Sequence, residues 1–571
     1  MPDWTYAPVI RPLLRRLGHE RAARVAVASV ERMSAVPGGP SLIRLLAWSY
    51  PLPGAGTVVL GRELACAAGV AGGLDTTGRA ARGLEALGAG FVEVGPVSAW
   101  DGLDLPRLDG LLLLRIAAGA AARLGTPPPQ VDAVVVAADD LPAALAWGRP
   151  VLAHAEDAAS ARRLLSAGAA GVVVRSAVLS DLSAGTLTLV VDGVSTAEDA
   201  VDVVRRGAVL VGLGPAALAA HGPGLPQRCA EALTALTGAA ARGGPPRQPA
   251  TSWAALLIGL ALMATGLGAA VISLGPVLLG YDRAFLAGGT EVLDVGRLLP
   301  FVRHDRITLA GVAVSVGVLY VALAHHGIRQ GLRWARVTLV ASCAIGMATL
   351  LLFLGFGYLD PLHAAVTALL VPLLAVAARS EPPVWRLAPA PEPGRQVRER
   401  ALLGQLLLVV VASGLVGGGV LISGIGISGV FVASDIAYLG VTADDLDRVS
   451  ERLVPFVAHD RAGFGGALMS QGVALLGLSL WGVRAGQAWV WWTLLWSAVA
   501  GFAPTLAIHF AIGYTDLGHL APVYLAGALT AAALALTSGY LRPSRARRRT
   551  PDLRAPAALR RRRSLDISQN R

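Results

Sequence analysis

The pattern of hydrophobic positions changes near residue 245 of this 571-residue chain. Before that point, short apolar runs alternate with alanine-rich stretches that carry charges, and no run is long enough to cross a bilayer. Such runs are typical of strands buried on both faces, so they predict an α/β domain with a parallel sheet or a (β/α) barrel. The runs are 91–95, 131–136, 171–174 and 187–191.

After residue 245 the hydrophobicity becomes nearly continuous. Eight segments approach the ~20 residues that a helix needs to cross the hydrocarbon core, so we predict an all-α membrane bundle of eight transmembrane helices. Charged or polar linkers divide the spans into two groups of four. The predicted spans are 252–280, 307–326, 335–356, 362–378, 402–431, 463–481, 489–512 and 517–538.

These patterns predict an order of domains along the chain. Residues 9–33 place apolar side chains opposite arginines, which predicts amphipathic helices rather than a signal peptide. The predicted parts are an amphipathic extension (1–50), an α/β barrel (51–242), a linker (243–251), a first membrane repeat (252–380), a cytoplasmic linker (381–401), a second membrane repeat (402–540) and an arginine-rich tail (541–571).

A repeated motif relates the two membrane groups. The sequence LPFVRHDR at 299–306 returns 155 residues later as VPFVAHDR at 454–461. After a one-residue insertion, GYLDPLH at 357–363 matches GYTDLGH at 513–519. Because each group has an even number of spans, both copies have the same orientation. The sequence therefore predicts two parallel repeats related by an axis near the membrane normal.

Each repeat carries a set of ionisable residues near the ends of its spans, which we expect to form two equivalent clusters on the outer face. Carboxylate and imidazole together could hold a divalent metal or relay protons. Alternatively, the aspartates cap helices while arginine and tyrosine anchor the interface, or the clusters sense a ligand. The candidates are Asp282, His304, Asp305, Arg306, Tyr358, Asp360, His363, Asp435, His459, Asp460, Arg461, Tyr514, Asp516 and His519.

Composition supports an integral membrane protein and excludes some chemistry. The mean hydropathy is +0.59, with 54% hydrophobic and 15% charged residues. The chain has no lysine, and its one asparagine is Asn570, so lysine Schiff bases and Walker-type phosphate loops are excluded. The three cysteines fit neither a disulfide framework nor a metal-binding spacing.

Charge predicts the orientation in the membrane. The net charge is +11, and the tail 541–571 holds eleven arginines against two aspartates. Such a tail suits anionic lipid at the cytoplasmic surface, and we expect no nucleic-acid binding because no aromatic residues are interleaved. Together with the arginine-rich linker between the groups, it predicts a plasma-membrane protein whose N-terminal domain and tail are cytoplasmic.

Motifs in the N-terminal half resemble the quinone-dependent (class 2) dihydroorotate dehydrogenases. They lie at 9–23, 71–78, 88–98, 192–200 and 221–225, in the order of that family. The resemblance implies a (β/α) barrel, an FMN cofactor and electron transfer to membrane quinone in pyrimidine biosynthesis. The matching positions would line the flavin or its phosphate, or else are turn and packing residues inherited with the fold: Ala71, Gly72, Asp75, Gly95, Ser98 and Gly193.

The same segments depart from that family where chemistry is concentrated. The lysine and asparagine of the flavin motif are Thr76 and Thr77, and a second flavin lysine falls on or near His154. The pyrimidine-binding asparagines are missing, as is a counterpart of the loop with the catalytic serine. The barrel segment is also short, so we predict a degenerate TIM-barrel-like domain.

Three functions follow from this combination. We predict a membrane-anchored flavin-binding, ligand-binding or regulatory protein that has lost dihydroorotate oxidation, and we expect that FMN, implied by the resemblance, has been lost with it. One alternative is an intact oxidoreductase that passes electrons to quinone. Another is a transporter built from parallel repeats, for which His509 is the one ionisable residue deep within a predicted span.

Overall fold

The computed structural model describes residues 3–17, 19–52, 56–182, 186–192, 194–236, 250–287, 290–349, 358, 361–379 and 393–543. The chain forms two compact units, one built on residues 1–243 and one on the membrane helices that follow. The amphipathic extension begins the first unit as a series of helices. These are α1 (Asp3–Thr5), the π-turn η1 (Tyr6–Ile10), α2 (Arg11–Arg15), α3 (His19–Ala35) and α4 (Gly39–Ala47).

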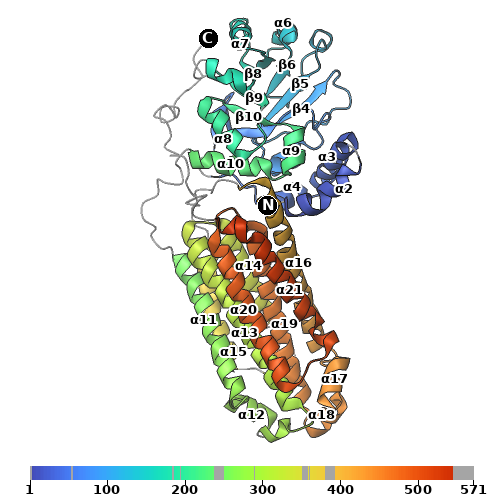
Figure 1. The fold of residues 1–571 in the computed structure, drawn as a ribbon, viewed down its shortest axis with the longest axis vertical. Coiled ribbons are helices and arrows are strands. Elements are labelled where there is room, and N and C mark those ends of the chain that lie inside the picture. Colours follow the sequence, from blue (N-terminus) through green and yellow to red (C-terminus); the bar gives the residue numbers. More distant parts are fainter. Residues whose placement is uncertain are drawn as a thin grey trace. The chain divides into compact units, whose positions relative to one another are not determined.

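The first unit contains a closed barrel of eight parallel strands, in the order β10-β3-β4-β5-β6-β7-β8-β9 (Figure 1). The strands are buried almost throughout, which explains their continuous runs of valine and leucine. They are β3 (Ala68–Val70), β4 (Phe91–Val97), β5 (Leu111–Ile116), β6 (Ala133–Val136), β7 (Val151–His154), β8 (Gly171–Arg175), β9 (Thr188–Asp192) and β10 (Leu210–Leu213).

Short helices cover the barrel, and a hairpin of β1 (Thr57–Val59) and β2 (Arg62–Leu64) packs Val59 and Leu64 against its interior side chains. The barrel prediction is confirmed, and all eight strands are present. The helices are α5 (Ala81–Ala86), α6 (Leu141–Leu145), α7 (Ala158–Ser166), α8 (Ala197–Arg206), α9 (Pro215–His221) and α10 (Leu225–Leu236), with 3₁₀ turns η2 (Ala121–Arg123), η3 (Ala138–Asp140) and η4 (Ser176–Asp181).

The second unit is a bundle of long helices (Figure 1). Its first half contains α11 (Ala250–Leu274), α12 (Gly280–Leu286), η6 (Thr290–Leu293), α13 (Leu298–Ala322), the π-turn η7 (Leu323–Gly327), η8 (Ile328–Gln330), α14 (Arg333–Thr349) and α15 (Pro361–Ala377). Its second half contains α16 (Arg395–Gly426), α17 (Ala433–Leu439), α18 (Ala443–Val449), α19 (Leu453–Gly477), the π-turn η10 (Leu478–Gly482), α20 (Ala488–Ile512) and α21 (Leu517–Leu541).

Six helices in the described part of the chain are long and apolar enough to span a membrane. They are α11, α13 with its continuation to Gln330, α16, α19 with η10, α20 and α21. The other two predicted spans coincide with α14 and α15, each 17 residues long as described, and residues 350–357 between them lie outside the described residues. The membrane bundle is confirmed with six candidate spans, while the number eight stays a prediction.

The two halves interlock through their second and third long helices. Ser315 of α13 bonds Ser497 of α20 at 2.7 Å, and Ser470 of α19 bonds Ser342 of α14 at 3.1 Å. Both pairs join one half to the other. Ser315 and Ser470 occupy matching positions 155 residues apart, as do Ser342 and Ser497. The duplication of the membrane module stays a prediction.

Candidate functional site

Among the described residues, most of the ionisable candidates of the membrane unit form one buried centre instead of two separate clusters. In each half, the arginine of the His-Asp-Arg motif pairs with the aspartate of the short helix that follows the first span. Arg306 Nη1 lies 3.0 Å from Asp282 Oδ2, and Arg461 Nη1 lies 2.7 Å from Asp435 Oδ2. Both aspartates are at most 1% exposed, so these are deeply buried ion pairs.

The aspartate of each motif reaches the arginine of the other half. Asp460 Oδ2 lies 2.9 Å from Arg306 Nε, and Asp305 Oδ2 lies 3.6 Å from Arg461 Nε. Each arginine therefore faces one carboxylate from its own half and one from the other. Because unpaired charges are costly in a bilayer protein, this exchange ties the two halves together.

Backbone groups complete the arginine sites. Arg306 donates to the carbonyl of Val277 and Arg461 to that of Val430, both at 2.7 Å. The two valines adopt φ of 61°, a left-handed conformation that β-branched residues rarely adopt. The centre therefore retains local backbone strain at two matching positions, which the surrounding contacts must offset.

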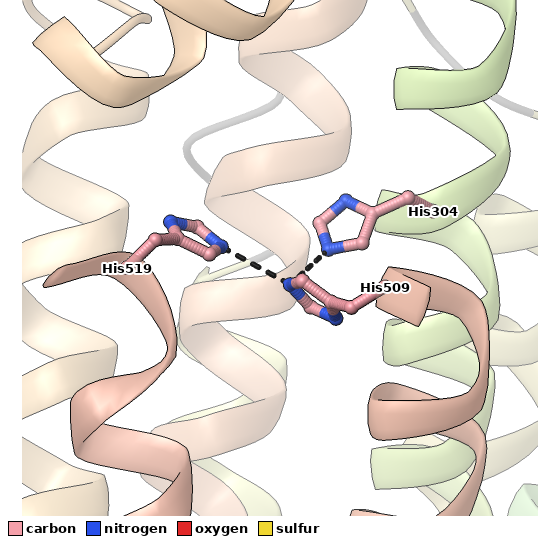
Figure 2. A group of neighbouring side chains, drawn as sticks. All are labelled: His304, His509 and His519. Atoms are coloured by element: carbon pink, nitrogen blue, oxygen red, sulfur yellow. Dashed lines mark hydrogen bonds between the residues drawn. The ribbon is translucent and has the colours of Figure 1, made fainter. Parts of the chain in front are cut away.

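Three histidines converge next to these ion pairs (Figure 2). His304 comes from α13, His509 from α20 and His519 from the first turn of α21. His304 Nε2 lies 2.9 Å from His509 Nε2, which lies 3.2 Å from His519 Nε2. His304 and His509 are buried, and His519 is half-buried.

The second nitrogen of each ring has its own neighbour. His509 Nδ1 lies 2.7 Å from the carbonyl oxygen of Thr505, and His304 Nδ1 lies 3.0 Å from Asp305 Oδ1. His519 Nδ1 lies 3.2 Å from the hydroxyl of Tyr514, which donates to Asp435 at 2.7 Å.

Electrostatics keeps the groups outside the spans in fixed protonation states. Burial and the neighbouring Asp435 carboxylate raise the pKa of Tyr514, so its hydroxyl keeps the proton that it donates. Burial acts to raise the pKa of Asp435, but the bond and charge of Arg461 outweigh it and hold that pKa below its usual value. Asp435 is therefore a stable anion in the centre.

The second half's motif histidine has different neighbours. His459 Nδ1 bonds Asp460 at 3.1 Å, and its ring contacts Tyr358, whose hydroxyl donates to Asp282. Counting back 156 residues from His509 reaches Phe353, which offers no ligand atom. The sequence therefore provides a three-histidine group on one side only.

The structure corrects part of the sequence reasoning. Asp305 and Asp460 lie well inside α13 and α19, so the interpretation of these aspartates as helix caps is wrong. Asp516 does cap a helix, because it accepts a bond from the His519 amide. Asp360 lies outside the described residues, and of His363 only the position in α15 is described. His509, flagged only as an isolated polar residue, completes the group.

The barrel presents its own charged group, formed by Glu93 within β4, Arg115 near the carboxyl end of β5 and His154 at the end of β7. Arg115 Nε bonds Glu93 Oε1 at 2.7 Å, and Glu93 Oε2 accepts the Gly72 amide at 2.7 Å. Burial and the nearby Arg115 charge lower the pKa of His154, so its imidazole is neutral at pH 7. Sequence reasoning missed Glu93 and Arg115, although a charged residue within an apolar strand is a usable signal.

The flavin candidates have different surroundings. Asp75 is 1% exposed and accepts bonds from the amides of Thr77, Gly78 and Ala80, so it organises its own loop. A Cβ on Gly72 would lie 2.9 Å from Arg115 Nε. The remaining candidates are Ala71, buried beside β10; Gly95, buried with positive φ; Ser98, exposed; and Gly193, outside the described residues.

Comparison with known proteins relates the barrel domain to one enzyme family. The N-terminal part resembles quinone-dependent dihydroorotate dehydrogenase. It is 40% identical over 131 residues to the dihydroorotate dehydrogenase (quinone) of Deinococcus deserti, covering 21% of this chain and 36% of that protein. The enzyme of Thermobifida fusca is 38% identical over 93 residues, covering 16% and 24%. The chain thus spans about a third or less of the length of these relatives.

Other comparisons add little. No protein-family profile matches the chain. Among solved structures, mandelate oxidase matches with 18% identity and a TM-score of 0.24, covering 36% of this chain and 92% of that one. A complex of mandelate oxidase with benzoyl-formic acid gives the same values.

Proposed function

We propose that this chain is a membrane-bound binding or regulatory protein whose barrel keeps the dihydroorotate dehydrogenase scaffold but not its reaction. The observation that carries the proposal is the composition of the barrel mouth. Arg115 is paired with Glu93, and His154 is held neutral. The sequence offers no lysine and, apart from Asn570, no asparagine.

These residues do not fit a redox-active flavin. An anionic reduced flavin needs a positive charge beside the ring, and the neutral His154 supplies none. The charge of Arg115 is balanced by a fully buried carboxylate. Asp75, the charged member of the candidate flavin set, already accepts hydrogen bonds from its own loop. We therefore assign no step to FMN.

A flavin measurement tests this proposal. The full chain, purified in detergent, should be colourless and release no FMN on denaturation. The matched variant combines Thr76→Lys, Thr77→Asn and His154→Lys, which places the expected family residues on the same scaffold. Stoichiometric FMN in the unchanged protein would refute the loss of the cofactor, whereas FMN in the variant alone would support it.

The similarity to enzymes named for quinone favours one second candidate, an oxidoreductase that passes electrons to membrane quinone. If this candidate is correct, the purified chain must reduce a soluble quinone analogue when dihydroorotate is supplied. We expect a rate no higher than that of heat-denatured protein. Sustained turnover, lost on adding an inhibitor of the related enzymes, would establish this candidate instead.

We also propose a plasma-membrane topology with the barrel and the arginine-rich tail in the cytoplasm and α18 outside. The support is the arginine distribution, which suits contact of the tail with anionic lipid at the cytoplasmic surface. A membrane-impermeant maleimide added to intact cells should label Asp444→Cys and spare Ser564→Cys until the cells are opened. The reverse pattern would invert the assignment.

A further inference from the structure

We propose that His304, His509 and His519 form a site for a divalent transition metal, with Zn²⁺ as the probe ion. The site lies in the membrane unit and is independent of the barrel. Figure 2 shows the three rings directed toward one another from three separate helices, with their Nε2 atoms innermost. All three ligand atoms lie within 4.8 Å of one another.

The spacing fits direct coordination. Zinc binds imidazole nitrogen at about 2.0–2.1 Å, so two ligands of a tetrahedral ion lie about 3.3 Å apart. The observed separations of 2.9 and 3.2 Å from His509 are close to this value, and the third pair, His304 and His519, lies within 4.8 Å, so these two rings must approach each other when an ion binds. Three neutral histidines with one open position is an established arrangement for zinc.

The neighbours of the Nδ1 atoms explain why the Nε2 atoms are available. The Thr505 carbonyl can only accept, so His509 carries its proton on Nδ1. The Asp305 carboxylate lies 3.0 Å from His304 Nδ1 without forming a hydrogen bond, and its negative charge favours a proton on that nitrogen. Tyr514 donates its own proton to Asp435, so His519 Nδ1 must donate to the Tyr514 oxygen.

These protonation states leave three Nε2 lone pairs pointing at one another. Neutral rings in this arrangement have no proton to share between the Nε2 atoms, so the contacts of 2.9 and 3.2 Å need a cation to become favourable. Carboxylate, carbonyl and hydroxyl groups behind the rings are the outer partners that metal-binding histidines usually have. An additional proton on one ring is the competing explanation.

The charge of the centre favours a doubly charged ion over one proton. Among the described residues of the centre, four carboxylates face two guanidinium groups, so two negative charges remain when the histidines are neutral. In the described part of the chain, Arg283 and Arg303 form no ion pair with these four carboxylates, and their guanidinium groups contact backbone carbonyl groups instead. The charges belong to Asp282, Asp305, Asp435, Asp460, Arg306 and Arg461.

The half-buried His519 gives an ion a route to the site. It lies in the first turn of α21, two residues after the exposed Leu517. Because one ligand comes from the first half of the bundle and two from the second, a bound ion would join the halves. The metal would therefore stabilise the same interface as the crossed ion pairs.

The experiment measures metal bound to the full chain, expressed without a polyhistidine tag and purified in detergent. Mass spectrometry of the dialysed protein should find about one Zn²⁺ per chain. His304→Ala and His509→Ala should reduce this content at least tenfold. The matched control is His459→Ala, which removes the corresponding buried histidine of the other half and should leave the content unchanged.

A second measurement protects the test against variants that fail to fold. His519→Gln changes a half-buried position and should keep the helical circular dichroism while weakening Zn²⁺ binding. Asp305→Asn should weaken affinity about 10–100-fold, as outer partners of metal ligands do, whereas the matching Asp460→Asn removes the same charge without touching a ligand ring and should weaken it less. Replacement by Co²⁺ should give the intense visible bands of a four-coordinate site.

Two outcomes would overturn the proposal. One is unchanged protein that binds neither Zn²⁺ nor Co²⁺ at micromolar concentration, which would leave the competing proton as the explanation. The other is equal metal loss in the folded His304→Ala and His459→Ala variants. Neither outcome bears on the flavin test, so the two proposals fail separately.

Discussion

Removing the guanidinium group of Arg461 should destabilise the membrane unit strongly. The change Arg461→Met keeps most of the side-chain length but deletes the 2.7 Å contact with Asp435 and the 2.7 Å bond to the Val430 carbonyl. It also deletes the cation–π contact over Phe301, at 5.0 Å from the ring centre. Asp435, which is fully buried, would then have no cationic partner.

The expected loss is about 3–5 kcal/mol in the free energy of unfolding, the usual cost of breaking a buried pair by removing one partner. Most of this loss comes from the Asp435 carboxylate, which stays buried without a cationic partner. The double variant Arg461→Met with Asp435→Asn should therefore recover about 1–3 kcal/mol relative to additivity. Reversible unfolding in detergent, followed by circular dichroism, measures both quantities.

Two further variants make the comparison specific. Arg306→Met removes the corresponding arginine of the first half and should have a similar effect, because Arg306 also contacts two carboxylates. Arg448→Met removes an exposed arginine of α18 and should leave stability unchanged within error. A loss below about 1 kcal/mol for Arg461→Met, or strict additivity in the double variant, would refute the role of buried charge pairing.

Three other predictions use single features of the structure. Gly466→Ala should cost about 1–3 kcal/mol because its Cβ would overlap a threonine of α14, while Gly414→Ala, with open space around it, should cost nothing; equal effects would contradict the packing. Asp75→Ala should lower the barrel's free energy of unfolding by about 2–4 kcal/mol because three backbone amides lose their acceptor, measurable by thermal unfolding. The pKa of Asp435 is lower when folded, so its stabilisation is present above about pH 4 and lost as the pH falls below that value. Asp435→Asn should flatten this part of the pH profile of unfolding, and an unchanged acid limb would contradict the assignment.

The crossed ion pairs explain why the repeated motif lies inside helices rather than at their ends. Asp305 and Asp460 each contact the arginine that the other half supplies, so neither half satisfies its own charges completely. Buried charge pairs stabilise less than apolar packing of similar volume, but they penalise incorrect register severely. The centre therefore specifies how the halves pair.

Apolar run length was sufficient to predict four of the eight barrel strands, β4, β6, β8 and β9, and the presence of a membrane bundle. A strand such as β6, Ala133–Val136, is buried on both faces and must be apolar throughout, and a span such as α11 must be apolar over its length. The apolar strand and the apolar span are both local features, so they can be recognised in the sequence without knowledge of the tertiary structure. The length of α14 and α15 was harder to predict, because hydrophobicity alone does not mark where a helix ends.

Site residues divide in the same way. The sequence alone determined which ionisable residues recur at an offset of 155. It therefore showed that His304, Asp305 and Arg306 have counterparts of the same residue type in the second repeat. It also determined that lysine-dependent chemistry is excluded. Only the tertiary structure decided that Asp305 faces the arginine of the other half and that His509 and His519 meet His304. These contacts join residues about 150 to 215 positions apart, and a distance of that kind is set by helix packing rather than by any local pattern.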